Sequence, residues 1–432
     1  MKKVYKSFIV YLSFDFSSKA LPVLLTPILA YYLTSSEFGL VSNYLVLLNI
    51  FGPLVALSTY SALTVFYFKN INSINSLFSN LTYLILLLTG ILLLVVIIFQ
   101  NQIIFYTKLS LVWVILGLFA AMLTSINNLY TSYLRMAMKA ILFGIIQFGE
   151  GMLTFIFTII FVVVFPFNWE GRIISIFLGS FIAFCFCLIY FHQNKILVFE
   201  KIEINRVKQF LFWGIPLIPH TLSFWIKSGI DRLIITNFVG LAANGIYSIA
   251  FTFAGVINLM TSAFFNIYAP YIYNKLTIMD SCEEKEKKRN ADHLVRNTYY
   301  YGLFVFTICL ILYFLLPFLI RLFFRGDYLL SIALMPWVYI MVFFGGLYAM
   351  ISSVLFHRNK TKQLGTITFS LSILQAGLSY ILVRHNGLTG VLLSGTIVSI
   401  LNFFLVLFLV NKEYNFQWNP FRSEIFNLTK FK

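Results

Sequence analysis

The chain has 432 residues, of which 60% are hydrophobic and only 11% are charged, and its net charge is +16. A soluble domain carries about 25% charged residues, so this composition excludes a soluble protein and indicates an integral membrane protein. The positive residues gather in particular links and are not interleaved with aromatic residues as on a nucleic-acid surface. No nucleic-acid partner is therefore expected.

Apolar runs of about twenty residues, separated by short polar links, predict twelve membrane-spanning helices and an all-α membrane protein. The expected spans are 8–33, 38–66, 78–100, 109–134, 141–166, 172–192, 209–236, 242–270, 297–320, 329–356, 363–384 and 388–411. The start, MKKVYKS, resembles that of a signal peptide. The run behind it is too long and contains Asp15 and Lys19, so it is predicted to be the first retained helix.

The distribution of Lys and Arg predicts the orientation of the chain. Most of the 31 positive residues lie in the N-terminus, the even-numbered links and the C-terminal tail. The odd-numbered links hold only Lys108, Arg172, Arg321, Arg325 and Arg384. Both termini are therefore predicted to be cytoplasmic. The long charged link between the eighth and ninth spans is expected to be a solvated amphipathic segment on the same side.

The two six-helix halves repeat one another weakly. Each opens with a proline pair, Pro22 with Pro27 and Pro216 with Pro219. The next helix opens with Gly39, Ser42 and Tyr44 in the first half and with Gly245, Tyr247 and Ser248 in the second. Ser132, Lys139 and Gly144 also have the spacing of Ser353, Lys360 and Gly365.

Because each half has an even number of spans, the halves should share one orientation and be related by a pseudo-two-fold axis along the membrane normal. The predicted organisation is a bundle at 1–192, a cytoplasmic linker at 193–208, a bundle at 209–411 and a cytoplasmic tail at 412–432.

Charged residues inside the predicted spans are the strongest functional signal, because such groups are costly in a bilayer and persist where they face a partner or water. The first helix carries Asp15 and Lys19 four positions apart. The seventh carries His220, Lys227 and Asp231 on one helical face, and Arg232 lies about 100° from Asp231. The positive members outnumber the acids, which favours a cavity for an anionic cargo.

A purely structural interpretation stays open for each of these residues. Asp15 with Lys19, and Lys227 with Asp231, would neutralise each other along one helix. His220 would be a neutral core histidine, and Arg232 would extend to the membrane interface. Glu150, in the fifth span, either carries a proton or cation or simply forms a hydrogen bond with a neighbour.

The sequence resembles the bacterial polysaccharide flippases of the Wzx type, which belong to the multidrug/oligosaccharidyl-lipid/polysaccharide exporter superfamily together with the MATE transporters. The residues that carry this resemblance are SKALPVLLTPILAYYLTSSEFGLVSNY and FWGIPLIPHTLSFWIKSGIDRLIITNFVG. It implies two bundles that alternate between inward-open and outward-open forms. The implied cargo is an oligosaccharide repeat unit (O-antigen or capsule type) on undecaprenyl diphosphate, moved from the cytoplasmic to the outer leaflet of the bacterial inner membrane.

On this resemblance Lys19, Lys227 and Arg232, with protonated His220, would neutralise the diphosphate. Asp15, Glu150 and Asp231 would couple an ion or pair with these charges, and aromatic residues such as Trp213 and Trp225 would stack on sugars. No cofactor beyond coupling H⁺ or Na⁺, no metal and no catalytic residue is expected. The implied partners are the lipid-linked cargo, membrane lipids, a polysaccharide polymerase and a chain-length regulator.

Two other functions stay open. A MATE-like exporter of small molecules would use Asp15 or Glu150 as its coupling site, but an exporter of cations favours an acidic cavity. A membrane polymerase or glycosyltransferase would need a sizeable outer loop with acid, base or Arg groups. The sequence has no such loop and no DxD-like pair on the cytoplasmic side, so an enzyme is not expected.

Overall fold

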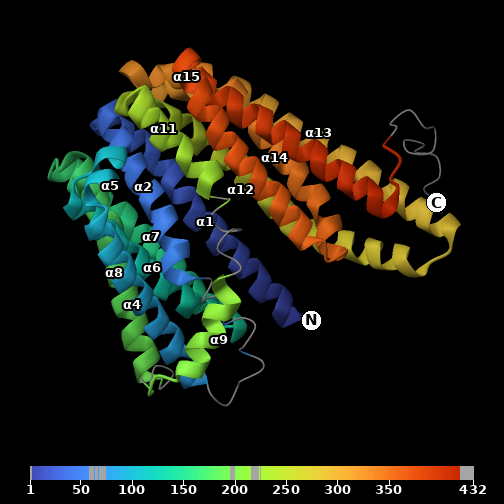
Figure 1. Ribbon diagram of the computed structural model, residues 1–432, viewed down its shortest axis with the longest axis horizontal. Helices are drawn as coiled ribbons and strands as arrows, with labels where there is room; N and C mark the ends of the chain where they lie inside the picture. The colour runs from blue at the N-terminus through green and yellow to red at the C-terminus, as the bar shows by residue number, and fades with distance from the viewer. Residues whose placement is uncertain are drawn as a thin grey trace. The chain divides into compact units, whose positions relative to one another are not determined.

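The computed structural model describes residues 2–57, 63, 67, 74–194, 200–215, 223 and 225–418. Within these residues the chain is helical with short connections and contains no β-strand, which confirms the predicted all-α class (Figure 1). Nine of the described helices are long and apolar enough to cross a membrane. The chain packs as two compact units, one of Met1–Ile249 with Phe324–Tyr328 and the other of Ala250–Phe323 with Leu329–Lys432.

The first unit is built mainly from long helices joined by short turns. Its elements are α1 (Lys2–Tyr32), α2 (Ser35–Ala56), α4 (Ile74–Ile98), α5 (Gln100–Thr107), α6 (Leu111–Met136), α7 (Ala140–Thr158), the π-helical turn η2 (Ile159–Val164), α8 (Asn168–Gln193), α9 (Ile204–Gly214), the π-helical turn η4 (Ile226–Ile230), α11 (Asp231–Phe238) and the first turns of α12 (Leu241–Ser281). Helix α6 packs against α2, α4 and α8, and α7 lies between α1 and α8. Phe78, Tyr130, Tyr133 and Phe191 form an aromatic cluster in the core of this unit.

The second unit contains the rest of α12 together with α13 (Glu284–Phe323), α14 (Ser331–His357) and α15 (Thr361–Tyr414); the short 3-10 turn η5 (Gly326–Leu330) leads into α14. In Figure 1 the long helices α13, α14 and α15 run side by side, in agreement with their extensive contacts. The helix α15 contains both of the last two predicted spans. It breaks at Gly387, whose φ of 54° and ψ of −134° fall in the predicted link between them.

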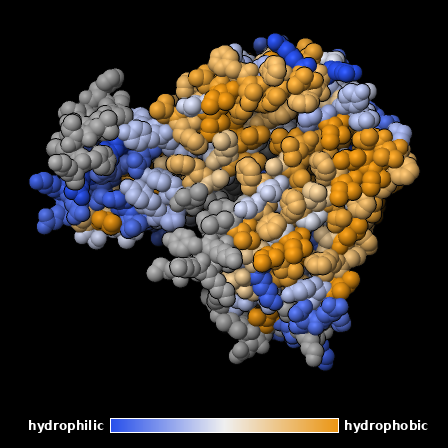
Figure 2. All heavy atoms as spheres, turned by 180° about the vertical axis from the view of Figure 1, so that it is seen from behind, coloured by the Kyte–Doolittle hydropathy of each residue, from blue (hydrophilic) through white to orange (hydrophobic). Residues whose placement is uncertain are grey.

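The surface of the helices is suited to lipid. Large apolar side chains are exposed along α4, among them Leu87, Leu94 and Ile98, which is the arrangement of a spanning helix with one face in hydrocarbon. Figure 2 shows hydrophobic side chains over much of one face, with hydrophilic ones gathered mainly at helix ends. The protein is therefore a multi-pass membrane protein.

Two predicted links are helical in the structure. The charged link after the eighth span is helical, because α12 continues to Ser281 and α13 begins at Glu284. At 41 and 40 residues, both helices far exceed the length of about 20 residues that a bilayer needs. Arg172, predicted in an outer link, lies inside α8 and is only 8% exposed, because α8 begins at Asn168.

The internal repeat is visible as two matching turns. Between α6 and α7 the N–H of Lys139 bonds the carbonyl of Leu134 at 2.9 Å, and between α14 and α15 the N–H of Lys360 bonds that of Leu355 at 2.9 Å. The residue before each lysine has a positive φ, 53° at Met138 and 56° at Asn359. The shared spacing in the sequence thus reflects a shared backbone conformation. The predicted halves themselves stay a prediction, since packing units do not test a division by sequence repeat.

Candidate functional site

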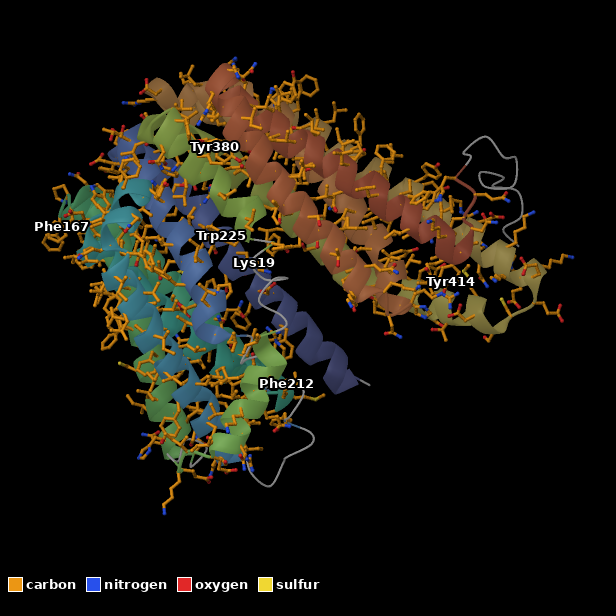
Figure 3. The ribbon with its side chains drawn as sticks, in the orientation of Figure 1. Lys19, Phe167, Phe212, Trp225, Tyr380 and Tyr414 are labelled. Carbon is orange, nitrogen blue, oxygen red and sulfur yellow. The ribbon has the colours of Figure 1, made fainter. Side chains whose placement is uncertain are left out.

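Asp15 and Lys19 form an ion pair along α1. Lys19 Nζ lies 2.7 Å from Asp15 Oδ2, and the two side chains are 52% and 36% exposed. The second carboxylate oxygen of Asp15 accepts a hydrogen bond of 3.1 Å from Gln147 on α7. The structure therefore shows the local pairing that the spacing allowed, and it leaves the Lys19 ammonium accessible (Figure 3).

The charged residues Lys227, Asp231 and Arg232 lie where the π-helical turn η4 joins α11. The wider π-turn replaces the regular α-helix assumed from the sequence, and such turns are frequent at functional sites. Asp231 is 1% exposed and accepts a hydrogen bond from the Tyr247 hydroxyl at 3.4 Å. Arg232 is partly buried, and its Nε–H is buried without a hydrogen-bond partner.

Trp225 directly precedes η4 and also has an unused donor. Its indole Nε1–H is buried without a partner. A Cβ atom on Gly229 would lie 2.7 Å from that nitrogen, so the indole ring packs directly against the backbone of η4. The segment from Trp225 to Arg232 therefore holds two buried N–H groups that a polar ligand would satisfy.

Glu150 lies in a polar pocket of side chains between α6, α7 and α8. Asn127 donates from Nδ2 to Glu150 Oε2 at 3.3 Å and to the carbonyl of Ser180 at 3.1 Å. Thr124 and Ser180 are joined by a hydroxyl–hydroxyl contact of 3.2 Å beside them. Within the described residues no cation pairs with Glu150, so its neighbours are neutral amide and hydroxyl groups.

A buried neutral network joins α2 to the start of α12. Asn244 Nδ2 donates to Asn43 Oδ1 at 2.9 Å and to the carbonyl of Gly39 at 3.1 Å. Asn43 Nδ2 donates to the carbonyl of Thr107 at 2.8 Å, and the Thr236 hydroxyl donates to Asn43 Oδ1 at 3.1 Å. Sequence reasoning missed both asparagines, although Asn43 lies between the selected Ser42 and Tyr44, and Asn244 directly precedes the selected Gly245.

The contact between α2 and α12 is reciprocal, as expected across a two-fold axis. A Cβ atom on Gly39 would lie 2.1 Å from the carbonyl oxygen of Leu241, and one on Gly245 would lie 2.0 Å from that of Ser35. Ser42 and Ser248 contact each other through their hydroxyls at 2.7 Å and are 206 positions apart, as are Ser35 and Leu241, and Gly39 and Gly245. Residues with the same sequence offset thus contact each other in pairs, which is the arrangement that the predicted pseudo-two-fold axis would produce.

The predicted site residues do not form one directly bonded cluster. Lys19 is paired with Asp15 near α7, Glu150 lies inside the bundle of α6, α7 and α8, and Arg232 follows η4. His220 lies outside the described residues, as do Pro216, Pro219 and the side chain of Trp213. The described members all belong to the first unit.

Comparisons with known proteins agree with this architecture. No family model matches the chain. In sequence it is similar to a Haemophilus influenzae protein named Lsg locus putative protein 1, at 29% identity over 281 residues that cover 63% of this chain and 67% of that protein. An uncharacterized membrane protein of the same organism is 27% identical over 274 residues, which span 62% of this chain and 64% of that protein.

Solved structures establish the fold. An inward-facing MATE-family multidrug transporter of the MOP superfamily has a TM-score of 0.69 and 15% identity, over 91% of this chain and 95% of that one. The lipid II flippase MurJ in an inward closed conformation has a TM-score of 0.67 and 17% identity, over 93% and 87%. The chain has the MATE-like fold of MOP-superfamily transporters, and these neighbours are transporters or flippases rather than enzymes.

Proposed function

We propose that this protein is a flippase that moves an undecaprenyl-diphosphate-linked oligosaccharide repeat unit, of the O-antigen or capsule type, from the cytoplasmic to the outer leaflet by alternating access. The fold is shared with drug exporters and with a lipid II flippase, so it supports membrane transport and leaves the cargo to be inferred from the residues. The charge of the site residues is therefore what indicates the kind of cargo.

The observation that carries the proposal is the state of Arg232. Its guanidinium keeps a buried Nε–H without a partner, and the indole N–H of Trp225, seven residues earlier, is also buried and unpartnered. Unsatisfied donors in a membrane segment are costly, and a guanidinium binds phosphate oxygens through paired, charge-assisted hydrogen bonds. A diphosphate-linked sugar offers acceptors of both kinds, phosphate oxygens for Arg232 and hydroxyl oxygens for Trp225.

Lys227 and Lys19 extend this positive site. Lys227 lies in the π-helical turn η4, five positions before Arg232 on α11. Lys19 is held by Asp15 at 2.7 Å but remains 52% exposed. An arriving phosphate would compete with Asp15 for the Lys19 ammonium, and Asp15 would keep its hydrogen bond to Gln147. In this arrangement Asp15 neutralises Lys19 before the cargo arrives, and Lys19 then pairs with the phosphate.

The reciprocal contact between α2 and α12 supplies a gate for alternating access. With both termini in the cytoplasm, as the positive residues predict, the Ser35 end of α2 faces outward. We propose that the close approach at Gly39 and Gly245 forms part of a closed outer gate. We propose that opening toward the outer leaflet separates Ser42 from Ser248 and breaks the Asn43–Asn244 hydrogen bond.

A second function, ion-coupled export of small molecules, is favoured by Glu150. This carboxylate has only amide and hydroxyl neighbours among the described residues, so it is suited to bind H⁺ or Na⁺. A flippase would also use such an ion-binding carboxylate, to couple transport to an H⁺ or Na⁺ gradient. Replacing Glu150 with Gln tests the coupling role itself: it abolishes the pH or Na⁺ dependence of transport in vesicles if Glu150 couples an ion, whatever the cargo is.

The proposed setting follows from the cargo. The protein would lie in the bacterial inner membrane and act before a polysaccharide polymerase and a chain-length regulator, which consume the flipped unit. Surrounding lipids are its other partners. We expect no catalytic step, because translocation makes and breaks no covalent bond in the cargo.

The decisive experiment is deletion in the native host, followed by analysis of lipid-linked oligosaccharides and surface polysaccharide. Complete repeat units stranded in the cytoplasmic leaflet, with surface polymer lost, support the flippase. Single units that reach the outer leaflet but never polymerise indicate a polymerase instead. Unchanged glycan with altered drug sensitivity indicates the exporter.

Complementation of the deletion then tests the residues. Arg232→Gln, Lys227→Ala and Lys19→Ala should reduce surface glycan at an unchanged protein level in the membrane. Arg321→Gln is the matched control, because Arg321 is exposed near the end of α13. Normal surface glycan in all three variants would remove the proposal of a cationic cargo site.

A further inference from the structure

Arg172 is a buried cation whose hydrogen bonds are incomplete. It lies in the first turn of α8 and is 8% exposed. Its Nη1 donates to the hydroxyl of Thr158 at 2.7 Å, and that hydroxyl donates to the carbonyl of Thr154 at 2.6 Å. The Nε–H of Arg172 is buried and has no partner. One edge of the guanidinium is therefore unsatisfied.

A second unsatisfied group lies beside it. Tyr44 on α2 is 0% exposed, its hydroxyl has no hydrogen-bond partner, and it interacts electrostatically with Arg172. Its ring is fixed against α6, where a Cβ atom on Gly117 would lie 3.1 Å from Tyr44 Cε2. Two buried donors from different helices, an N–H of Arg172 and the O–H of Tyr44, thus remain unused.

No acid in the described part of the chain compensates the charge of Arg172. Glu170, two positions earlier on α8, is exposed and forms no ion pair with it. Glu150 lies eight residues before Thr158 on α7, which is about 12 Å along a helix axis. Its carboxylate accepts the hydrogen bond of Asn127 instead.

The physical chemistry of this arrangement distinguishes a bound anion from a bound water. A buried ion without a counter-charge costs several kcal/mol even after relaxation. A water molecule would satisfy the two donors but leave the charge uncompensated, whereas an anion does both. Two buried donors, the N–H of Arg172 and the O–H of Tyr44, suit a single monovalent ion without its hydration shell.

We propose that Arg172 and Tyr44 form a buried site for one monovalent anion of the halide class, chloride in the cell, between α2, α7 and α8. The Nε–H of Arg172 and the hydroxyl of Tyr44 donate to the ion. The Nη1 of Arg172 stays on Thr158, which fixes the guanidinium plane. This site is separate from the proposed cargo residues and does not depend on the proposed function.

The test uses the purified full chain in detergent, with thermal unfolding measured as potassium gluconate is replaced by potassium chloride at constant ionic strength. We expect a saturable rise in Tm for the native protein, because a ligand that binds only the folded state stabilises it. Arg172→Gln should abolish the rise. Tyr44→Phe should weaken the apparent chloride affinity about tenfold, the effect of one charge-assisted hydrogen bond. Arg321→Gln should behave as the native protein.

Two results would overturn the proposal. One is an equal Tm of the native protein in chloride and in gluconate. The other is the same chloride-dependent rise in Arg172→Gln. If Arg172→Gln does not fold, crystals of the native protein grown in bromide decide: an anomalous peak between Arg172 Nε and the Tyr44 hydroxyl supports the site, and its absence excludes it.

Discussion

The two ends of α12 are held by opposite kinds of interaction. Near its start, around Gly245, the backbone touches that of α2, and the surrounding bonds join neutral, buried groups such as Asn244 and Ser248. Near its end, Asp280 accepts hydrogen bonds from Arg358 at 3.0 Å and from the Tyr414 hydroxyl at 2.9 Å. These groups at the end of the helix are partly exposed, with the Asp280 side chain at 32%.

This difference follows from the solvent around each end. Close packing of small residues and neutral hydrogen bonds hold helices together where water and the hydrophobic effect are absent. Ion pairs cost less to form where water can still solvate them, but they also contribute less. We therefore expect the start of α12 to tolerate far less change than its end.

The largest effect should come from adding one methyl group at the helix crossing. Gly39→Ala and Gly245→Ala place a Cβ atom 2.1 and 2.0 Å from a backbone carbonyl oxygen, which cannot move away as a flexible side chain would. Each change should destabilise the unit by about 1–3 kcal/mol, seen as a lower Tm in detergent and loss of complementation.

The same helices provide matched controls for these glycines. A Cβ atom on Gly52 of α2 or on Gly255 of α12 would meet nothing within 4 Å. Gly52→Ala and Gly255→Ala should therefore be neutral or slightly stabilising, because alanine is the better helix former. Similar losses of Tm at all four positions would mean that the crossing is not held by close backbone contact.

A smaller effect is expected from Asn43→Ala. The change removes one amide that serves the carbonyl of Thr107, Asn244 and Thr236 at once, and each buried group left unsatisfied costs about 1–3 kcal/mol. Asn49→Ala, on an exposed face of the same helix, is the control. A double-mutant cycle of Asn43→Ala with Asn244→Ala should show strong coupling; additive losses of Tm would contradict the network.

Features set by local sequence could be predicted, whereas features set by contacts between distant residues could not. Hydropathy predicted the spans, and spacing predicted that Gly39 and Gly245 are equivalent. The position of Arg172 could not be predicted, because a charged residue near the end of an apolar run is normally assigned to a link. Its burial is set by residues of α2 and α7 that are distant in the sequence. The partner of Asp15 was predicted from i,i+4 spacing, whereas the π-helical turn beside Lys227 has no clear signal in the sequence.

Mutation of the polar contacts that Asp280 makes at the end of α12 should change the stability of the protein only slightly. Asp280→Asn removes the negative charge that Arg358 and Tyr414 contact but keeps a polar group of the same size. The free energy of unfolding should therefore fall by about 1 kcal/mol or less. It should also shrink at high salt, because exposed pairs are screened. Glu286→Gln, an exposed acid at the start of α13, is the control. A loss as large as that of Gly245→Ala would contradict the contrast between the two ends.

The smallest effect is expected where the chain before α9 docks on α4. Glu203 accepts hydrogen bonds from the Ser76 hydroxyl and, at 2.7 Å, from Arg206 Nε, and these donors, the hydroxyl foremost, hold the pKa of Glu203 below its usual value near 4.5. A carboxyl group with a lowered pKa stabilises the folded state above its unfolded pKa and loses that contribution as pH falls through the folded value.

Docking of this segment should therefore be intact at neutral pH and weaken below about pH 4.5, the range set by that lowered value. Hydrogen exchange at the Glu203 amide, which donates to Asn80 Oδ1 at 2.8 Å, reports the docking directly. In Glu203→Gln exchange should be faster at neutral pH and lose its acid dependence, whereas Glu200→Gln should keep the native profile. An unchanged acid response in Glu203→Gln would show that another group sets it. Because Glu203 is exposed to water, its charge makes the docking sensitive to pH, unlike the neutral crossing of α2 and α12, whose amides and hydroxyls do not titrate in this range.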